Sequence, residues 1–379
     1  MNGRKAYKFR LYPNREQEEL FHKTFGCCRF LYNRMLADKA EMYEKTGKIK
    51  RLTPAGYKKD YPWLKEVDSL ALANVQLHLE AAYKNFFSRE KAGHPKFKSK
   101  HRSRKSYTTN AVNGNIRMEG GKLRLPKAGY VKIRCHREIP ENYILKSVTV
   151  SMEPSGKYYA ALLYEYPVSE NQTGRRSMAD REWAGTAGTP DVFGIDFAMQ
   201  GMAVFSDGSR AEYPMYYRKA QKHIAREQRK LSRCRKGSRN YLKQKRILAK
   251  RYEKVRNQRK DYLHKLSRKI ADGHDAAAVE DIDMKGMSRC LKFGKNVMDD
   301  SYGMFRGMLG YKLEEQGKEL VTVGKFFPSS KKCSRCGRIR EDLKLSERVY
   351  RCECGNCMDR DVNAAVNIRE EGRRLLTAS

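Results

Sequence analysis

Tryptophan, histidine and long apolar runs are nearly absent from this sequence. Two Trp and eight His occur among its 379 residues. No run of about eighteen apolar residues is present to span a bilayer, and the first residues, MNGRKAYKFR, contain no apolar signal core. The apolar residues are not gathered into a basic amphipathic anchor either. We therefore expect no membrane partner and a location in the reducing cytoplasm.

Acidic residues are scarce relative to basic ones. Eighty Lys and Arg stand against 44 Asp and Glu, which gives a formal net charge of +36. So many cations repel one another unless they lie along a long polyanion, where binding releases condensed counterions. The composition therefore predicts a nucleic-acid partner.

The first part of the chain combines a strand, helices and further strands. Alternation predicts a strand over 5–12, and apolar residues at three- and four-residue spacing predict helices over 15–33 and 69–87. Short runs of period two between 107 and 167 predict an antiparallel barrel or sandwich. Since 5–12 has no strand partner nearby in the sequence, we expect it to join this sheet, which makes the helical region an insertion.

A strongly basic segment, KAGHPKFKSKHRSRK (91–105), separates these helices from the strands. Its composition cannot form a core and suits contact with phosphates, with a solvated basic loop as the alternative. The candidate nucleic-acid contacts are Lys96, Lys98, Arg102, Arg104 and Lys105.

A second set of elements follows a linker rich in Ser, Gly and Thr, which we place at 173–190. Residues 192–214 predict a three-stranded meander. Residues 218–268 predict one or two long helices, whose 21 Lys and Arg against three acidic residues favour a position along nucleic acid. The remaining predicted elements are a strand over 276–283, a helix over 301–316 and a strand over 319–327.

Three carboxylates occur where the ends of predicted elements would deliver them. Asp196 lies in an apolar strand, Glu280 lies in a second short apolar strand, and Asp361 opens the helical pattern DVNAAVNI. A buried carboxylate is costly unless it is paired or coordinated. For Asp361 alone, a plain helix N-cap is the alternative interpretation.

Together these acids would form a site for hard metal ions. Three carboxylates on one mixed sheet would hold two Mg²⁺ or Mn²⁺ about 4 Å apart, a pair that activates water and stabilises the leaving oxygen of a phosphodiester. No Walker loop, dinucleotide fingerprint or Ser-His-Asp order suggests another chemistry. The nearest rivals for ligand roles, which we leave as outer or surface groups, are Asp281, Asp283 and Asp359.

The cysteines near the end of the chain have the spacing of a thiolate metal site. Cys333-x-x-Cys336 and Cys352-x-Cys354 would hold one structural Zn²⁺ in a tetrahedron. Spacing alone does not settle the ligands, because Cys354-x-x-Cys357 has the more usual gap. Repeat symmetry favours Cys352 and Cys354, since both pairs then end in Cys-Gly, and Cys357 is the alternate ligand.

Motifs along almost the whole chain resemble the TnpB family, transposon-encoded RNA-guided nucleases related to type V CRISPR effectors. The matching segments, in family order, are KFRLYPNREQEE, FGCCRFLYNR, GIDFA, VEDIDMKGM, FFPSSKKCSRCG and DRDVNAAVNI. The resemblance implies a multidomain α+β and α/β protein with a ribonuclease-H-like (RuvC) nuclease domain, in which Asp196, Glu280 and Asp361 are the acidic triad.

The resemblance also implies a division into domains. The expected parts are a wedge-like β-barrel (1–13 and 105–172), a helical recognition domain with the basic linker (14–104), the linker 173–190, the nuclease domain (191–330 and 359–379) and a zinc-binding insertion that contacts target nucleic acid (331–358).

The function implied is an RNA-guided DNA endonuclease of a transposable element. A guide RNA and target DNA would be its partners, with cleavage beside a short flanking motif in a prokaryotic cytoplasm, at the nucleoid. The oligomeric state stays open. The alternatives are a guide-directed DNA-binding regulator without nuclease activity and a zinc-ribbon transposase that acts without RNA.

Overall fold

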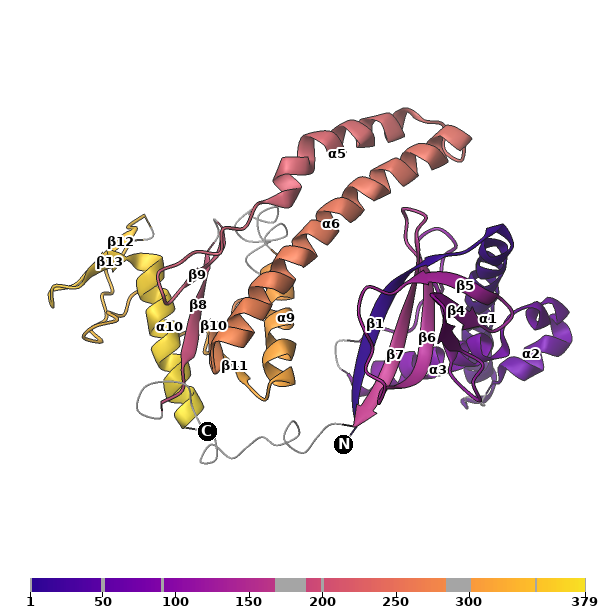
Figure 1. The fold of residues 1–379 in the computed structure, drawn as a ribbon, viewed down its shortest axis with the longest axis horizontal. Coiled ribbons are helices and arrows are strands. Elements are labelled where there is room, and N and C mark those ends of the chain that lie inside the picture. Colours follow the sequence, from indigo (N-terminus) through magenta and orange to yellow (C-terminus); the bar gives the residue numbers. More distant parts are fainter. Residues whose placement is uncertain are drawn as a thin grey trace. The chain divides into compact units, whose positions relative to one another are not determined.

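The chain folds into two compact units, Met1–Val168 and Ser169–Ser379 (Figure 1). The structure is a computed structural model that describes residues 2–48, 52–89, 92–167, 189–198, 201–283, 301–344 and 346–378. Most of the predicted linker 173–190 lies outside the described residues, as does the end of the motif VEDIDMKGM. Among the helices described, none is long and apolar enough to cross a membrane.

The first unit is built on a seven-stranded antiparallel sheet with the order β2-β6-β7-β1-β5-β4-β3. No described pairing joins β2 to β3, so the described strands form a half-barrel, where the sequence predicted an antiparallel barrel or sandwich. Its strands are β1 (Asn2–Tyr12), β2 (Lys105–Asn110), β3 (Arg117–Glu119), β4 (Lys122–Leu125), β5 (Gly129–Arg134), β6 (Ile144–Met152) and β7 (Tyr158–Pro167).

The N-terminal strand joins this sheet, as the sequence predicted. β1 pairs with β7 along ten residues, from Asn2 opposite Pro167 to Leu11 opposite Tyr158, and also with β5. The helices between β1 and β2 are therefore an insertion into the sheet. They are α1 (Arg15–Thr46), α2 (Pro54–Asp60), the 3₁₀ helix η1 (Pro62–Glu66) and α3 (Ser69–Ser88).

Helix α1 begins where the sequence predicted and ends later. Asn14 and Gln17 form a reciprocal capping box, with hydrogen bonds of 2.8 and 3.1 Å, which fixes the start. The helix continues to Thr46 rather than ending near residue 33, because Met35 and Leu36 extend its buried stripe. It ends at Gly47, whose φ of 63° is left-handed.

The second unit contains a mixed four-stranded sheet with the order β11-β10-β8-β9. β10 pairs in parallel with both β8 and β11, and β9 is antiparallel to β8. The elements are β8 (Val192–Ala198), β9 (Met202–Phe205), α5 (Tyr216–Arg233), α6 (Arg239–Gly273), β10 (Ala276–Glu280), α9 (Tyr302–Glu315), β11 (Glu319–Val323), β12 (Val349–Arg351), β13 (Cys357–Asp359) and α10 (Arg360–Thr377).

Alternate residues of the central strands face opposite layers, which positions the acids. Phe193 of β8 and Val279 of β10 pack in one core with α6 and α9, whereas Val192 and Ala278 pack in a second core with α10. Figure 1 shows α10 on one side of the sheet and α6 with α9 on the other. The sheet is therefore the middle layer of three.

Three predicted strands are shorter in the structure than the sequence suggested. The third strand of the expected meander is reduced to an isolated bridge between Val204 and Arg210. The strand predicted over 276–283 ends at Glu280, and the strand predicted over 319–327 ends at Val323. Apolar runs overestimate strand length here because the chain turns while it is still apolar, at Phe326 and Phe327.

Candidate functional site

The three predicted acids lie at neighbouring ends of three elements. Asp196 and Glu280 each come one position after the last register pair of β8 and β10, which is Ile195 with Val279. By alternation, both carboxylates emerge on the face covered by α10. Asp361 lies in the first turn of that helix.

The direction of α10 brings Asp361 to the same edge of the sheet. A Cβ atom on Gly372 would contact Ala278, and a Cβ atom on Gly194 would lie 2.1 Å from the Ala365 carbonyl oxygen. The path from Gly372 to Ala365, towards the N-terminus of α10, thus follows β8 and β10 towards their C-terminal ends. Continued one turn further, the helix starts beside the carboxyl ends of β8 and β10.

All three acids are half-buried, and the pKa of Asp196 is affected by both of the others. Burial raises the pKa of the Asp196 carboxyl group well above the ordinary range, and the charges of Glu280 and Asp361 raise it further, while the Arg360 guanidinium opposes them. The negative charges of Glu280 and Asp361 therefore both act on the Asp196 carboxylate. The carboxylate oxygens of the three acids do not all lie within 4.8 Å of one another. Among the described residues, the four sulfurs of the cysteine cluster described below do.

The N-cap of α10 is Asp359, so the interpretation of Asp361 as a plain cap is wrong. Oδ1 of Asp359 accepts hydrogen bonds from the backbone N–H groups of Asp361 at 2.9 Å and Val362 at 3.1 Å. Its Oδ2 accepts a hydrogen bond from Arg210 at 2.9 Å. The Asp361 carboxylate therefore does not cap the helix, and its nearest cation is Nε of Arg360, 3.8 Å away.

The two other rival acids lie just after β10 with exposed side chains. Asp281 is 3.6 Å from a guanidinium nitrogen of Arg306, and Asp283 follows two residues later. Neither side chain is enclosed as Asp196 is.

Glu280 has a neighbour that the sequence did not reveal. Burial raises the pKa of Glu280, and a hydrogen bond donated by the hydroxyl of Ser329 to its Oε1 partly offsets that effect. Ser329 is buried and lies after β11, in the segment that leads to the cysteines. A serine in the motif FFPSSKK gives no sequence signal of such a role.

Tyr302 at the start of α9 also borders the acids. Burial raises the pKa of its hydroxyl, and the Asp196 charge adds to that effect. The hydroxyl oxygen is buried and has no hydrogen-bond partner among the described residues.

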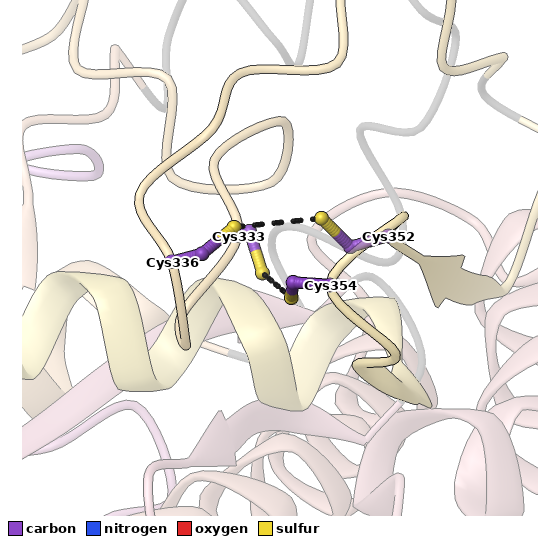
Figure 2. Close-up of side chains that lie close together, drawn as sticks. All are labelled: Cys333, Cys336, Cys352 and Cys354. Atoms are coloured by element: carbon purple, nitrogen blue, oxygen red, sulfur yellow. Dashed lines mark hydrogen bonds between the residues drawn. The ribbon is translucent and has the colours of Figure 1, made fainter.

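Four cysteine sulfurs gather in a second cluster, the cysteine cluster (Figure 2). The Sγ atoms of Cys333, Cys336, Cys352 and Cys354 all lie within 4.8 Å of one another. The closest contacts cross between the two pairs, 3.7 Å from Cys333 to Cys354 and 3.6 Å from Cys336 to Cys352. Such a set of sulfurs from two turns fits one tetrahedral ion.

The turns that carry these cysteines depend on glycine. Gly337 and Gly355 each follow the second cysteine of a pair, with φ values of 79° and 85° that favour residues without a Cβ. Cys357, the alternate ligand, lies outside the cluster because it is the first residue of β13 and pairs with Arg351.

Cys333 is predisposed to be a thiolate. Burial raises the pKa of its thiol, but hydrogen bonds from the backbone of Cys336 and Arg335 and from the Asn356 amide outweigh burial and lower the pKa to about 6. The amide nitrogen of Asn356 lies 3.4 Å from the sulfur. This is the deepest sulfur of the cluster, with 1% of the residue exposed.

Two buried asparagines dock the cysteine cluster on α10. The Asn363 side chain accepts a hydrogen bond from Ser334 N–H (3.0 Å) and donates one to the Lys332 carbonyl (2.7 Å). One turn later, the Asn367 amide donates to the carbonyls of Ser329 (2.7 Å) and Lys332 (2.6 Å). Sequence analysis missed both asparagines, although their four-residue spacing in DVNAAVNI placed them on one helix face.

A basic cavity of about 350 Å³ lies in the first unit between α1, α3 and the segment before β2. Three of the five predicted nucleic-acid contacts line it, namely Lys98, Arg104 and Lys105. Lys96 and Arg102 are exposed and do not line it. Three further basic side chains in the lining, Arg29, His78 and Lys100, were not predicted from the sequence.

Lys98 and Arg29 are half-buried, whereas Lys100, Arg104 and Lys105 are exposed. The Lys98 ammonium lies 3.8 Å from the centre of the Tyr32 ring, and burial lowers the pKa of this group. Burial and the nearby Lys98 charge also lower the pKa of His78. Lys98 therefore contributes to packing against α1 as well as to the charge of the cavity.

The predicted basic helices form a hairpin of α5 and α6 in the second unit (Figure 1). Polar contacts hold part of the hairpin together: the Gln244 amide donates to Glu227 at 2.7 Å, and the Gln228 amide donates to the Tyr252 hydroxyl at 2.8 Å. Two of the three acidic residues over 218–268, Glu227 and Glu253, are buried, so the exposed surface of the hairpin is strongly basic.

Three known families match separate parts of the chain. The family described as "Probable transposase" matches residues 165–291, a family described as "Cas12f1-like, TNB domain" matches 302–368, and a "Helix-turn-helix domain" matches 1–48. Over 2–48 the structure contains one strand and one long helix, so the last description does not correspond to a helix-turn-helix here.

Two relatives that match nearly the whole chain carry a common name, and a third matches part of it. A "Putative RNA-guided DNA endonuclease" of Streptomyces pristinaespiralis is 32% identical over 97% of this chain and 89% of its own length. "Putative RNA-guided DNA endonuclease InsQ" of Escherichia coli K12 is 31% identical over 99% of this chain and 94% of its own. "TnpB-like protein L79" of Acanthamoeba polyphaga mimivirus is 32% identical over 33% of this chain and 25% of its own.

A solved structure has a similar fold. The Cas12f1 chain of a cryo-electron microscopy complex with sgRNA and target DNA superposes with a TM-score of 0.57, over 97% of this chain and 99% of that one, at 14% identity. At this identity the likeness concerns the fold.

Proposed function

We propose that this chain, which belongs to the TnpB family, is an RNA-guided DNA endonuclease that cleaves target DNA beside a short flanking motif. The observation that carries the proposal is the convergence of Asp196, Glu280 and Asp361 from two parallel strands and one helix. A regulator that only binds DNA has no need for a half-buried carboxylate, Asp196, that is repelled by two further carboxylates at a single sheet edge.

The acid site fits divalent cations with oxygen ligands. Asp196 and Glu280 are held on the face that α10 covers, and Asp361 comes from the start of that helix. A cation between them would relieve the repulsion that raises the pKa of Asp196. The Tyr302 hydroxyl nearby, which has no hydrogen-bond partner among the described residues, would donate to an oxygen of a bound phosphate or water. Two Mg²⁺ or Mn²⁺ ions bound there would activate water and stabilise the leaving oxygen of a phosphodiester.

The acid site and the cysteine cluster would bind different metal ions. Carboxylate oxygens select Mg²⁺ or Mn²⁺, whereas the four sulfurs of Cys333, Cys336, Cys352 and Cys354 select Zn²⁺. We assign one structural Zn²⁺ to the cysteine cluster, where it would fix the two turns that rest on α10.

Nucleic acid would be held by the basic surfaces of both units. The cavity lined by Lys98, Lys100 and Arg104 suits phosphate groups, and the exposed face of the α5–α6 hairpin suits a second stretch of backbone. Lys105 also lines this cavity, and Lys96 and Arg102 extend the first surface. Base pairing with a guide RNA would supply sequence specificity, as in RNA-guided recognition generally.

The parts of the chain take corresponding roles in this proposal. The sheet of the first unit (1–13 and 105–172) is the wedge, its helical insertion (14–104) is the recognition domain, and 191–330 with 359–379 form the RuvC-like nuclease. The cysteine segment 331–358 contacts target nucleic acid, and the protein acts in the cytoplasm on chromosomal DNA.

The test is reconstitution from RNA that copurifies with the protein. That RNA is sequenced, and plasmids that carry a complementary target with randomised flanks are incubated with the complex and Mg²⁺. We expect cleavage only beside a particular flank and only with the RNA. Binding of the target without any cleavage would support a regulator instead, and the absence of bound RNA of defined length would support a transposase that acts without a guide.

A further inference from the structure

Ser329 lies between the acid site and the cysteine cluster and touches both regions. Its hydroxyl donates a hydrogen bond to Oε1 of Glu280, whereas its backbone carbonyl accepts a hydrogen bond from the Asn367 amide at 2.7 Å. The residue is buried, with 7% of its surface exposed. The side chain thus faces an acid while the main chain is anchored elsewhere.

The anchoring of Ser329 does not depend on its hydroxyl. Its backbone N–H donates to the Phe327 carbonyl at 2.8 Å, and Lys332 closes the following turn by donating to the Pro328 carbonyl at 2.9 Å. Asn367 then binds the carbonyls of both Ser329 and Lys332. Because the turn is already fixed by these contacts, the hydroxyl is left to interact with Glu280.

Helix α10 therefore helps to position two of the three acids. Helix α10 carries Asp361 in its first turn and, through Asn367 about two turns later, holds the serine that contacts Glu280. A carboxylate with one oxygen held by a neutral donor keeps its other oxygen in a defined direction.

We propose that Ser329 is a positioning residue that orients the Glu280 carboxylate for metal binding, and that Asn367 holds Ser329 in place. The inference rests on the proposed function, since it concerns a ligand of the same acid site. It adds a residue from the turn between β11 and the cysteine cluster to the outer shell of that site, so the docking of the cysteine cluster on α10 also sets the geometry of the acids.

The test measures Mn²⁺ binding directly, by electron paramagnetic resonance of free Mn²⁺ during a titration of the RNA-bound protein. The same complex with Asp196→Ala is the blank for Mn²⁺ held by RNA and other sites. We expect Ser329→Ala to raise the Mn²⁺ concentration at half-saturation about tenfold, the range seen when an outer-shell partner of a metal ligand is removed. The Mn²⁺ concentration needed for half-maximal cleavage should rise in parallel.

Two matched variants separate positioning from a general loss of structure. Ser329→Thr keeps the hydroxyl and should restore most of the Mn²⁺ affinity. Ser330→Ala removes the neighbouring hydroxyl, which has no hydrogen-bond partner among the described residues, and should bind Mn²⁺ as the unmodified protein does. Ser329→Ala with unchanged Mn²⁺ affinity, or Ser329→Thr as weak as Ser329→Ala, would overturn the proposal.

The variant Asn367→Ala tests whether Asn367 holds Ser329 in place, with zinc content measured in addition to Mn²⁺ affinity. Because Asn367 holds the Lys332 carbonyl next to Cys333, its removal should lower both the Mn²⁺ affinity and the zinc content, whereas Ser329→Ala should lower only the former. Asn367→Ala with normal Mn²⁺ affinity would contradict its role. If the unmodified complex binds no more Mn²⁺ than the Asp196→Ala blank, the acid site itself fails and this inference falls with it.

Discussion

Gly372 of α10 lies against Ala278 of β10 so closely that a Cβ atom on Gly372 would be 2.3 Å from the Ala278 Cβ. A glycine inside a helix normally costs about 1 kcal/mol relative to alanine. Here it permits the close approach that places the start of α10 beside the carboxyl ends of β8 and β10, so packing at one end of the helix determines the acid site at the other.

Gly372→Ala should therefore destabilise the second unit despite its higher helix propensity. We expect the free energy of unfolding to fall by about 1–3 kcal/mol, the usual cost of overpacking a core. Gly307 of α9 is the matched control, because a Cβ atom there meets nothing within 4 Å. Gly307→Ala should stabilise by up to about 1 kcal/mol. Denaturation followed by circular dichroism measures both, and equal stabilisation by both variants would contradict the packing argument.

Substitution of single cysteines should distinguish the four zinc ligands from Cys357, which lies nearby in sequence. Cys336→Ser should reduce the zinc content from one ion per chain towards none, because its sulfur is one of the four within 4.8 Å. Cys357→Ser should keep the zinc, since that residue lies in β13 outside the cluster. Metal analysis of the purified proteins gives the answer, and loss of zinc from Cys357→Ser would reassign the fourth ligand.

Arg104 should contribute to nucleic-acid binding through phosphate contact alone. Arg104→Ala should weaken RNA or DNA binding without regard to sequence and should reduce the slope of log K against log salt by about 1. Lys59→Ala is the control, since Lys59 is exposed on α2 and does not line the cavity. Binding isotherms at several salt concentrations provide the measurement. A slope unchanged by Arg104→Ala would remove the cavity from the interface.

The raised pKa of Asp196 predicts that, in the absence of divalent cations, the stability of the folded protein depends on pH. The unfolded chain releases this proton near the ordinary pKa of 3.8, whereas the folded protein retains it to higher pH. The folded state therefore binds more protons in that interval, and its stability falls as the pH rises from about 4 towards the folded pKa. Above that value the loss is complete and constant.

Asp196→Asn should remove this loss. At neutral pH in a chelator the variant should be more stable than the unmodified protein, and the addition of Mg²⁺ should stabilise the unmodified protein but not the variant. Thermal unfolding at several pH values, with and without Mg²⁺, checks both parts. A variant less stable than the unmodified protein in chelator would show that the acids do not repel one another as described.

Patterns local in sequence predicted much of this architecture. Alternation in 5–12 and the absence of nearby partners placed β1 in the sheet of β5 and β7, and the apolar strands before Asp196 and Glu280 predicted where two of the acids lie. The Cys-Gly repeat anticipated which four sulfurs gather, because each turn needs a left-handed residue.

Features that depend on tertiary contacts were not predictable in this way. Asp359 rather than Asp361 caps α10, and two aspartates separated by one residue give the same local signal. Ser329, Asn363 and Asn367 gain their roles only because the segment after β11 folds back on α10. The choice between a barrel and a sandwich also stayed open, since period-two patterns do not report whether β2 pairs with β3.

Cleavage of a plasmid target by the RNA-bound protein in Mg²⁺, with and without Asp196→Ala, tests the central claim most directly. We expect the substitution to reduce cleavage by more than about 100-fold, since loss of an outer-shell partner alone costs 10–100-fold, and to leave the amount of bound RNA unchanged. Asp207→Ala, at an exposed turn after β9, serves as the control and should cleave normally. Cleavage that persists in Asp196→Ala at the rate of the control would contradict the assignment of the acid site.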